Sequence, residues 1–165
     1  MNPPTALEPR LRPFLRLARL AGADGVGGHE LALPMEVRRE RSARQSRRLG
    51  RLVMRPGPAP AAVDELVIPV EGGRIRARAY RPPGPGPHPL YVFFHGGGWC
   101  SGTIDEREPR CRAVAAGAGC VVVSVDYRLA PENQYPTAPE DCYRALTWLV
   151  DRAERLGLDP SRVRV

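Results

Sequence analysis

Two short apolar runs, each followed at once by a polar motif, limit the fold of this chain more than any other feature. Residues 90–94 read LYVFF and lead into HGGGW, and residues 120–125 read CVVVSV and lead into Asp126. Runs of this length and composition predict strands that are buried on both faces. Such strands belong to parallel sheets covered by helices, so we predict an α/β fold with a mostly parallel sheet and helices on both faces.

Two stretches with helical periodicity accompany these strands. Between the strands, four residues share one predicted helix face: Cys111, Val114, Ala115 and Ala118. After them, residues 137–156 carry apolar residues in the same register, at Cys142, Ala145, Leu146, Leu149, Val150 and Ala153. Thr137 and Glu140 have the spacing of a capping box, and Gly157 is typical of a helix stop.

The chain before residue 56 predicts two further helices. Residues 9–21 form an apolar stripe surrounded by arginines, which is the pattern of an amphipathic helix. Residues 34–52 are charged nearly all round, and Glu40 and Arg44 are placed for an ion pair one helical turn apart. We assign residues 1–55 to amino-terminal cap helices and residues 56–165 to the amino-terminal part of a catalytic domain.

The second part begins with a predicted hairpin. Residues 64–70 and 73–80 read as two extended stretches joined by a glycine pair. Residues 81–89 contain several prolines, which lack the N–H that a central strand needs, so we expect an exposed connection. Residues 162–165 read as the start of one more strand, and we expect the sheet to be truncated at this carboxyl end.

The basic charge is concentrated in the first part of the chain. All 25 basic residues are Arg, the net charge is +7 and the pI is about 9.9. Residues 1–55 hold 12 Arg and 5 acidic residues, whereas residues 56–165 hold 13 of each. An arginine-rich binding module is therefore an alternative, resting on Arg38, Arg39, Arg41, Arg44, Arg47, Arg48, Arg51 and Arg55. Without interleaved aromatic residues a solvated helix face is the simpler reading, and no nucleic acid partner is expected.

The cysteines and the apolar runs indicate a cytoplasmic protein. The cysteines, at 100, 111, 120 and 142, form no C-x-x-C pair, and Cys120 and Cys142 lie in apolar patterns that predict buried thiols. Neither disulfides nor a metal site is expected. Arginine and proline interrupt the longest amino-terminal apolar stretch, and no run approaches the roughly 18 residues of a membrane span.

The glycine loop after the first apolar run suits acyl-transfer chemistry. Such chemistry needs hydrogen-bond donors aimed at the oxygen that becomes negative in the tetrahedral intermediate. Backbone N–H groups of a glycine loop can supply these donors, because no side chain obstructs the approaching carbonyl. HGGGW at residues 95–99 meets this requirement.

Together with DYRLAPE at residues 126–132, HGGGW resembles the hormone-sensitive-lipase-like branch of the α/β-hydrolases, known as alpha/beta hydrolase fold-3. The resemblance runs from about residue 64 to residue 165. It implies an esterase or lipase that hydrolyses small-molecule esters with a serine nucleophile and no cofactor. By this resemblance Gly97 and Gly98 provide the oxyanion-hole N–H groups, Gly96 shapes the loop, His95 holds it by hydrogen bonding and Trp99 lines the substrate pocket.

The resemblance also implies a structural brace beneath the site. The brace residues are Asp126, Arg128 and Glu132, with Arg128 and Glu132 as the expected ionic partners. Asp141 is expected to be a further brace and not a catalytic acid. The resemblance places the strand that ends at His95 between the strand that ends at Asp126 and the one that begins near Val163.

The catalytic triad is not found in these residues. His95 and Asp126 cannot form one, because α/β-hydrolases carry Ser, then Asp or Glu, then His along the chain. The serines, at 42, 46, 101, 124 and 161, all lie outside a G-x-S-x-G motif. We expect the nucleophile shortly after Val165, and we expect residues 1–165 alone to be inactive.

Three other classes of protein share parts of this sequence pattern. Gly97, Gly102 and Thr103 have the spacing of a phosphate-binding loop, but the chain has no Lys to complete it. A dinucleotide-binding G-x-G-x-x-G fails because Ser101 stands where the third glycine belongs. A noncatalytic member of the hydrolase family remains open, and the residue at the serine position would decide it.

Overall fold

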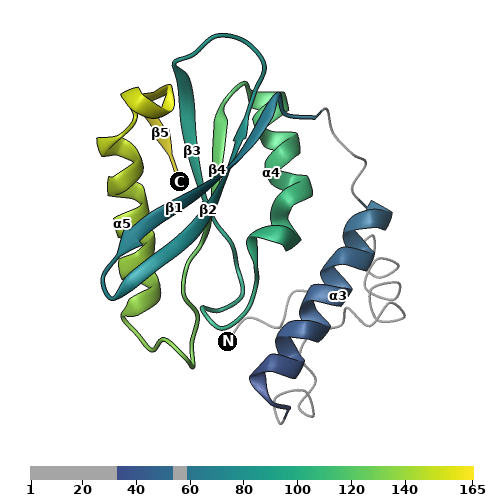
Figure 1. The fold of residues 1–165 in the computed structure, drawn as a ribbon. Helices are drawn as coiled ribbons and strands as arrows, with labels where there is room; N and C mark the ends of the chain where they lie inside the picture. Colours follow the sequence, from purple (N-terminus) through teal and green to yellow (C-terminus); the bar gives the residue numbers. More distant parts are fainter. Residues whose placement is uncertain (1–32, 54–58) are drawn as a thin grey trace, which may run out of the picture. The chain divides into compact units, whose positions relative to one another are not determined.

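The computed structural model describes residues 33–53 and 59–165 (Figure 1). The chain divides into two compact units, residues 1–45 and 46–165. The helix predicted over residues 9–21 lies outside the described residues and stays a prediction, as does the domain boundary at residue 55. None of the described helices is long and apolar enough to cross a membrane.

The charged helix is present as predicted. Helix α3 spans Met35–Val53, and the Arg38 N–H donates to the Pro34 carbonyl at 3.1 Å. Arg44 donates to Glu40 at 3.2 Å across one turn, and both side chains are well exposed. The predicted pair is therefore confirmed, although an exposed pair of this kind contributes little to stability.

A five-stranded mixed sheet organises the second unit, with the strand order β1-β2-β4-β3-β5. The strands β1 and β2 form the predicted antiparallel hairpin, β2 and β4 are antiparallel, and β3 is parallel to both β4 and β5. The position of β3 between the other two parallel strands is as expected. The bounds are β1 Ala62–Val70, β2 Gly73–Arg81, β3 His88–Phe94, β4 Val121–Asp126 and β5 Leu158–Arg164.

Helices cover both faces of this sheet, as predicted. In Figure 1, α4 (Ile104–Ala118) and α5 (Thr137–Asp151) lie on opposite sides of it. Successive side chains of β4 point to opposite faces of the sheet. Val121, Val123 and Val125 belong to the core cluster under α5, and Val122 belongs to the cluster under α4. Every residue of β4 before Asp126 is buried, which confirms a strand covered on both faces.

Strand β3 departs from its prediction in two respects. It starts at His88, so Pro89 belongs to a central strand that was predicted to begin only at Leu90. Pro89 is tolerated because pairing with β4 begins only at Leu90, and the pairing with β5 is irregular between Pro89 and Leu90. The strand is also less buried than expected, since Tyr91 and Phe93 are only partly covered on the α4 side.

The helix ends also differ from the prediction. Thr137 is the first residue of α5 and not its cap, and no side chain caps this helix, so the capping box proposed there is wrong. Thr103 caps α4 instead, because its Oγ1 accepts the Glu106 N–H at 3.3 Å. On α4, Ala118 is exposed and does not join the buried face.

The chain after α5 adopts a short turn before the last strand. Helix α5 ends at Asp151, and a 3-10 turn over Glu154–Leu156 follows it. Gly157, at φ 64°, ends that turn, whereas it was predicted to end the long helix. Strand β5 therefore starts at Leu158, earlier than the predicted residue 162.

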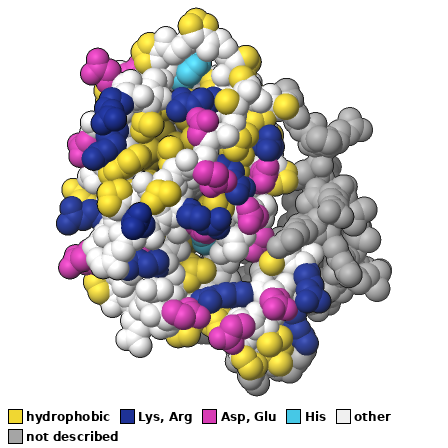
Figure 2. Space-filling model, in the orientation of Figure 1, with side chains coloured by type: hydrophobic (Ala, Val, Ile, Leu, Met, Phe, Trp, Pro, Cys, Tyr) yellow, Lys and Arg dark blue, Asp and Glu magenta, His cyan; other side chains and the backbone are white. Residues whose placement is uncertain are grey.

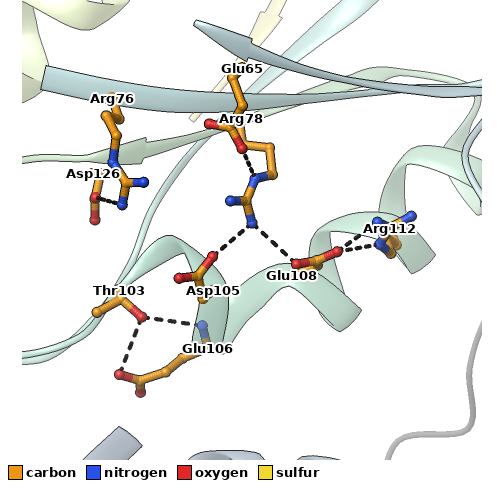
Figure 3. Close-up of polar contacts among 9 residues, drawn as sticks. All are labelled: Glu65, Arg76, Arg78, Thr103, Asp105, Glu106, Glu108, Arg112 and Asp126. Carbon is orange, nitrogen blue, oxygen red and sulfur yellow. Dashed lines mark hydrogen bonds and ion pairs between the residues drawn. The ribbon is translucent and has the colours of Figure 1, made fainter. Parts of the chain in front are cut away.

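One partly buried arginine, Arg78, connects the hairpin to α4. Arg78 of β2 donates to Glu65 of β1 at 2.5 Å, and to Asp105 and Glu108 of α4 at 2.8 and 3.1 Å (Figure 3). The Arg78 side chain is only 14% exposed. Elsewhere on this face basic and acidic side chains are interspersed (Figure 2), as the balanced charges of residues 56–165 predict.

We predict that Arg78→Met lowers the free energy of unfolding by about 2 kcal/mol, because the substitution leaves three carboxylates without their shared cation. The control is Arg76→Met, on the same strand face, whose 60% exposed side chain pairs with one carboxylate among the described residues, that of Asp126 at 2.9 Å. That variant should lose less than about 0.5 kcal/mol in urea unfolding at neutral pH. Equal losses would contradict the bridging role of Arg78.

A second prediction concerns alkaline pH. Burial raises the pKa of Tyr80 and Tyr127 to about 12, of Cys111 to about 11 and of Cys142 to about 12. The unfolded chain releases these protons from about pH 9 upward while the folded chain retains them, so stability should fall as the pH rises. We expect a lower urea midpoint at about pH 10.5 than at about pH 8, and a smaller decrease for Cys142→Ala. An unchanged midpoint would contradict this account.

Candidate oxyanion-hole loop

The candidate site lies where β3 and β4 end side by side. The two strands are parallel, with Phe94 opposite Val125, so the segments that follow them leave the same edge of the sheet. The first segment is the glycine loop over residues 95–102, and the second begins at Asp126. The prediction that these two motifs are neighbours is confirmed.

The glycine loop folds around one carbonyl group. The Gly97 carbonyl accepts the N–H groups of Cys100 and Ser101 at 3.2 and 3.1 Å, and the Ser101 hydroxyl at 3.0 Å. The N–H groups of Gly97 and Gly98 donate to no acceptor within the described part of the chain. The loop therefore uses its oxygen internally and leaves two neighbouring donors available.

Glycine is required at three positions of this loop for different reasons. A Cβ on Gly97, whose φ is 146°, would lie 1.9 Å from the Ser101 carbonyl oxygen. A Cβ on Gly102 would lie 2.4 Å from Nδ1 of His95, and Gly98 has a left-handed φ of 61°. Gly96 differs, because its φ lies outside the left-handed range and a Cβ there would meet no described atom beyond residues 95–97 within 4 Å.

His95 is buried beneath the loop. It is 3% exposed, and its Nδ1 lies 3.2 Å from the Gly96 carbonyl oxygen. Burial is the main cause that lowers the pKa of this imidazole, and Arg107 acts in the same direction. The ring is therefore neutral at neutral pH.

Tyr127, the residue after β4, contacts both His95 and Trp99. Its hydroxyl donates to the His95 carbonyl oxygen and lies 3.3 Å from Nδ1 of the same residue. Its ring stacks on the imidazole with centroids 4.3 Å apart and planes 15° apart, and it lies 5.3 Å from the Trp99 ring. Tyr127 was not among the predicted site residues, because the contact joins two segments 32 residues apart.

Trp99 closes the loop in an unusual backbone conformation. Its φ is 62°, a left-handed value that a residue with a Cβ rarely adopts. Its carbonyl accepts the Ala130 N–H at 2.9 Å, so the chain after β4 holds this end of the loop as well. The indole is 50% exposed and is thus free to contact a bound molecule.

An ion pair supports the segment after β4. Arg128 donates through Nε and Nη2 to the two carboxylate oxygens of Asp141 at 2.8 and 2.7 Å, and through Nη2 to the Glu71 carbonyl at 2.9 Å. Asp141 is 1% exposed. Glu132 was the expected ionic partner of Arg128, whereas the structure places the Asp141 carboxylate against its guanidinium group. Asp126 accepts from Arg76 at 2.9 Å (Figure 3).

The chain resembles known ester hydrolases in this region and beyond it. Residues 91–165 match the model of the alpha/beta hydrolase fold family. The chain is 39% identical over 163 residues to the carboxylic ester hydrolase LipN of Mycobacterium tuberculosis, covering 96% of this chain and 40% of that protein. It is 37% identical to the carboxylesterase NlhH of the same organism, covering 100% of this chain and 50% of that protein.

The chain is also similar to a solved esterase structure. An esterase of Pyrobaculum calidifontis matches with a TM-score of 0.80 at 36% identity, covering 96% of this chain and 47% of that one. The chain thus spans about half the length, or less, of these proteins.

We predict that Gly97→Ala destabilises the second unit by about 2 kcal/mol or more, because the new Cβ collides with the Ser101 carbonyl and the φ of 146° becomes strained. The adjacent Gly96→Ala serves as the control and should change stability by less than about 0.5 kcal/mol, since its Cβ meets open space. Thermal unfolding of the two variants tests this, and equal effects would show that the loop does not have this conformation.

Proposed function

Because this chain belongs to the alpha/beta hydrolase fold family, we propose that the protein is a carboxylic ester hydrolase that acts by acyl transfer to a serine. One observation carries the proposal. A glycine loop at the end of a parallel strand leaves the N–H groups of Gly97 and Gly98 without an acceptor among the described residues. Donors fixed in advance at such a place stabilise the negative oxygen of a tetrahedral intermediate.

The roles of the individual residues follow from this proposal. Gly97 and Gly98 donate to the oxyanion, and His95 and Gly96 support the loop from which they donate. The half-exposed indole of Trp99 lines the substrate pocket next to these donors. The buried position of His95 supports its assignment as a support and not as the catalytic base.

The segment after β4 serves as the brace. Asp126, Arg128 and Glu132 belong to it, and the hydrogen bonds of Arg128 to Asp141 and Glu71 support this assignment. Asp141 is then a structural partner, because both of its carboxylate oxygens accept from one guanidinium group.

The nucleophile, the acid and the base are assigned to parts of the protein outside residues 1–165. The serine reaction needs no cofactor, and the substrate is a small-molecule ester. We further propose that residues 1–55 form amino-terminal cap helices. We also propose that the protein is cytoplasmic, an assignment supported by the buried thiols of Cys111, Cys120 and Cys142, which form no disulfide.

We predict that the whole protein hydrolyses short-chain p-nitrophenyl esters. Replacement of the serine at the G-x-S-x-G elbow by Ala should lower kcat by roughly 1,000-fold or more, because the acyl-enzyme can no longer form. Residues 1–165 expressed alone should not exceed the uncatalysed rate. Full activity of the serine variant would refute serine chemistry, and a protein with no serine at that position would be a noncatalytic family member.

A further inference from the structure

We propose that Tyr127 is a positioning residue that fixes the direction of the oxyanion-hole N–H groups through the carbonyl group of His95. This inference rests on the proposed esterase function and adds to it a residue from the strand next to the glycine loop. Tyr127 does not touch the reacting atoms in this account. It acts by restraining the backbone that presents Gly97 and Gly98.

The loop needs such a restraint at its beginning. Gly96 has no Cβ, and no described atom outside residues 95–97 lies within 4 Å of the position that one would occupy. Glycine has wide conformational freedom, so packing around Gly96 does not fix the orientation of the loop. The orientation must come from hydrogen bonds to the backbone on either side.

Tyr127 supplies the hydrogen bond at this point. The His95 carbonyl and the Gly96 N–H share one planar peptide unit, so a donor to that oxygen fixes the rotation of the whole unit. The Tyr127 hydroxyl donates to this oxygen, and the stacked rings 4.3 Å apart hold the hydroxyl in place. Further along the loop the Ala130 N–H holds the Trp99 carbonyl at 2.9 Å. Both His95 and Trp99, on either side of the three glycines, are thus attached to the segment after β4.

The hydroxyl remains a donor under assay conditions. Burial raises the pKa of Tyr127 to about 12, so the group keeps its proton throughout the range in which ester hydrolysis is measured. Tyr127 is 4% exposed, which shields the hydrogen bond from competition with water.

The test is Tyr127→Phe in the whole protein, a substitution that keeps the ring and removes the hydroxyl. The matched control is Tyr80→Phe, because Tyr80 is also buried but lies in the core cluster under α4. The measurements are kcat and KM with p-nitrophenyl butyrate, the inhibition constant of a trifluoromethyl ketone, and amide hydrogen exchange over residues 95–101. The ketone forms an oxyanion when a serine adds to it, so its affinity reports on the donors directly.

We expect Tyr127→Phe to lower kcat by roughly 10- to 100-fold and to change KM by less than about threefold. The inhibition constant of the ketone should rise by the same factor as kcat/KM falls, and residues 95–101 should exchange faster. Tyr80→Phe should leave all three measurements near their original values. A loss of stability without altered loop exchange would not produce this pattern.

Equal effects of the two substitutions, or unchanged exchange over residues 95–101 in Tyr127→Phe, would overturn the inference while leaving the esterase proposal intact. If the unaltered protein hydrolyses no ester and binds no ketone, the proposed function itself fails. The exchange measurement needs no activity, so the two failures are distinguishable.

Discussion

The parallel pairing of β3 with β4 is the constraint on which the rest of the structure depends. Its register, with Phe94 opposite Val125, makes both strands end at the same level and brings two motifs more than 25 residues apart in the sequence into contact. Helices α4 and α5 cover the two faces of this pair, and the hairpin extends it on the β4 side. A shift of one residue would turn each side chain to the other face and separate Tyr127 from His95.

The sequence predicted the helices and strands that depend on local patterns. The predictions were wrong where contacts with a neighbouring strand determine the ends of an element. The alternation along β2 and the continuous apolar run of β4 are clear local patterns, so both strands were predicted. Pro89 was predicted to lie outside the strand because proline lacks an N–H for strand pairing. This rule applies to residues paired on both sides, and Pro89 has no partner on β4, which only the fold shows. Helix α5 was extended past Asp151 because the apolar spacing continues to Ala153, although the backbone there turns toward β5.

The same division holds for the candidate site. The glycine loop was predicted because its chemistry depends on consecutive residues. The contacts that hold it were not, because they join positions far apart in the sequence: Tyr127 to His95, and Ala130 to Trp99. The ion pair of Arg128 with Asp141 crosses from the end of β4 to α5, and the nearer Glu132 was therefore the more obvious candidate. A motif thus indicates which residues act, and the packing of neighbouring strands determines what restrains them.

The crowded carbonyl of Gly97 has an electronic consequence. This oxygen accepts three hydrogen bonds, and it belongs to the same peptide unit as the N–H of Gly98. Hydrogen bonds polarise the groups through which they are linked, by about 10 to 30% per bond. Electron density drawn toward the Gly97 oxygen leaves the Gly98 hydrogen more positive. The folding of the loop on itself therefore makes the exposed amide a stronger donor than an isolated peptide.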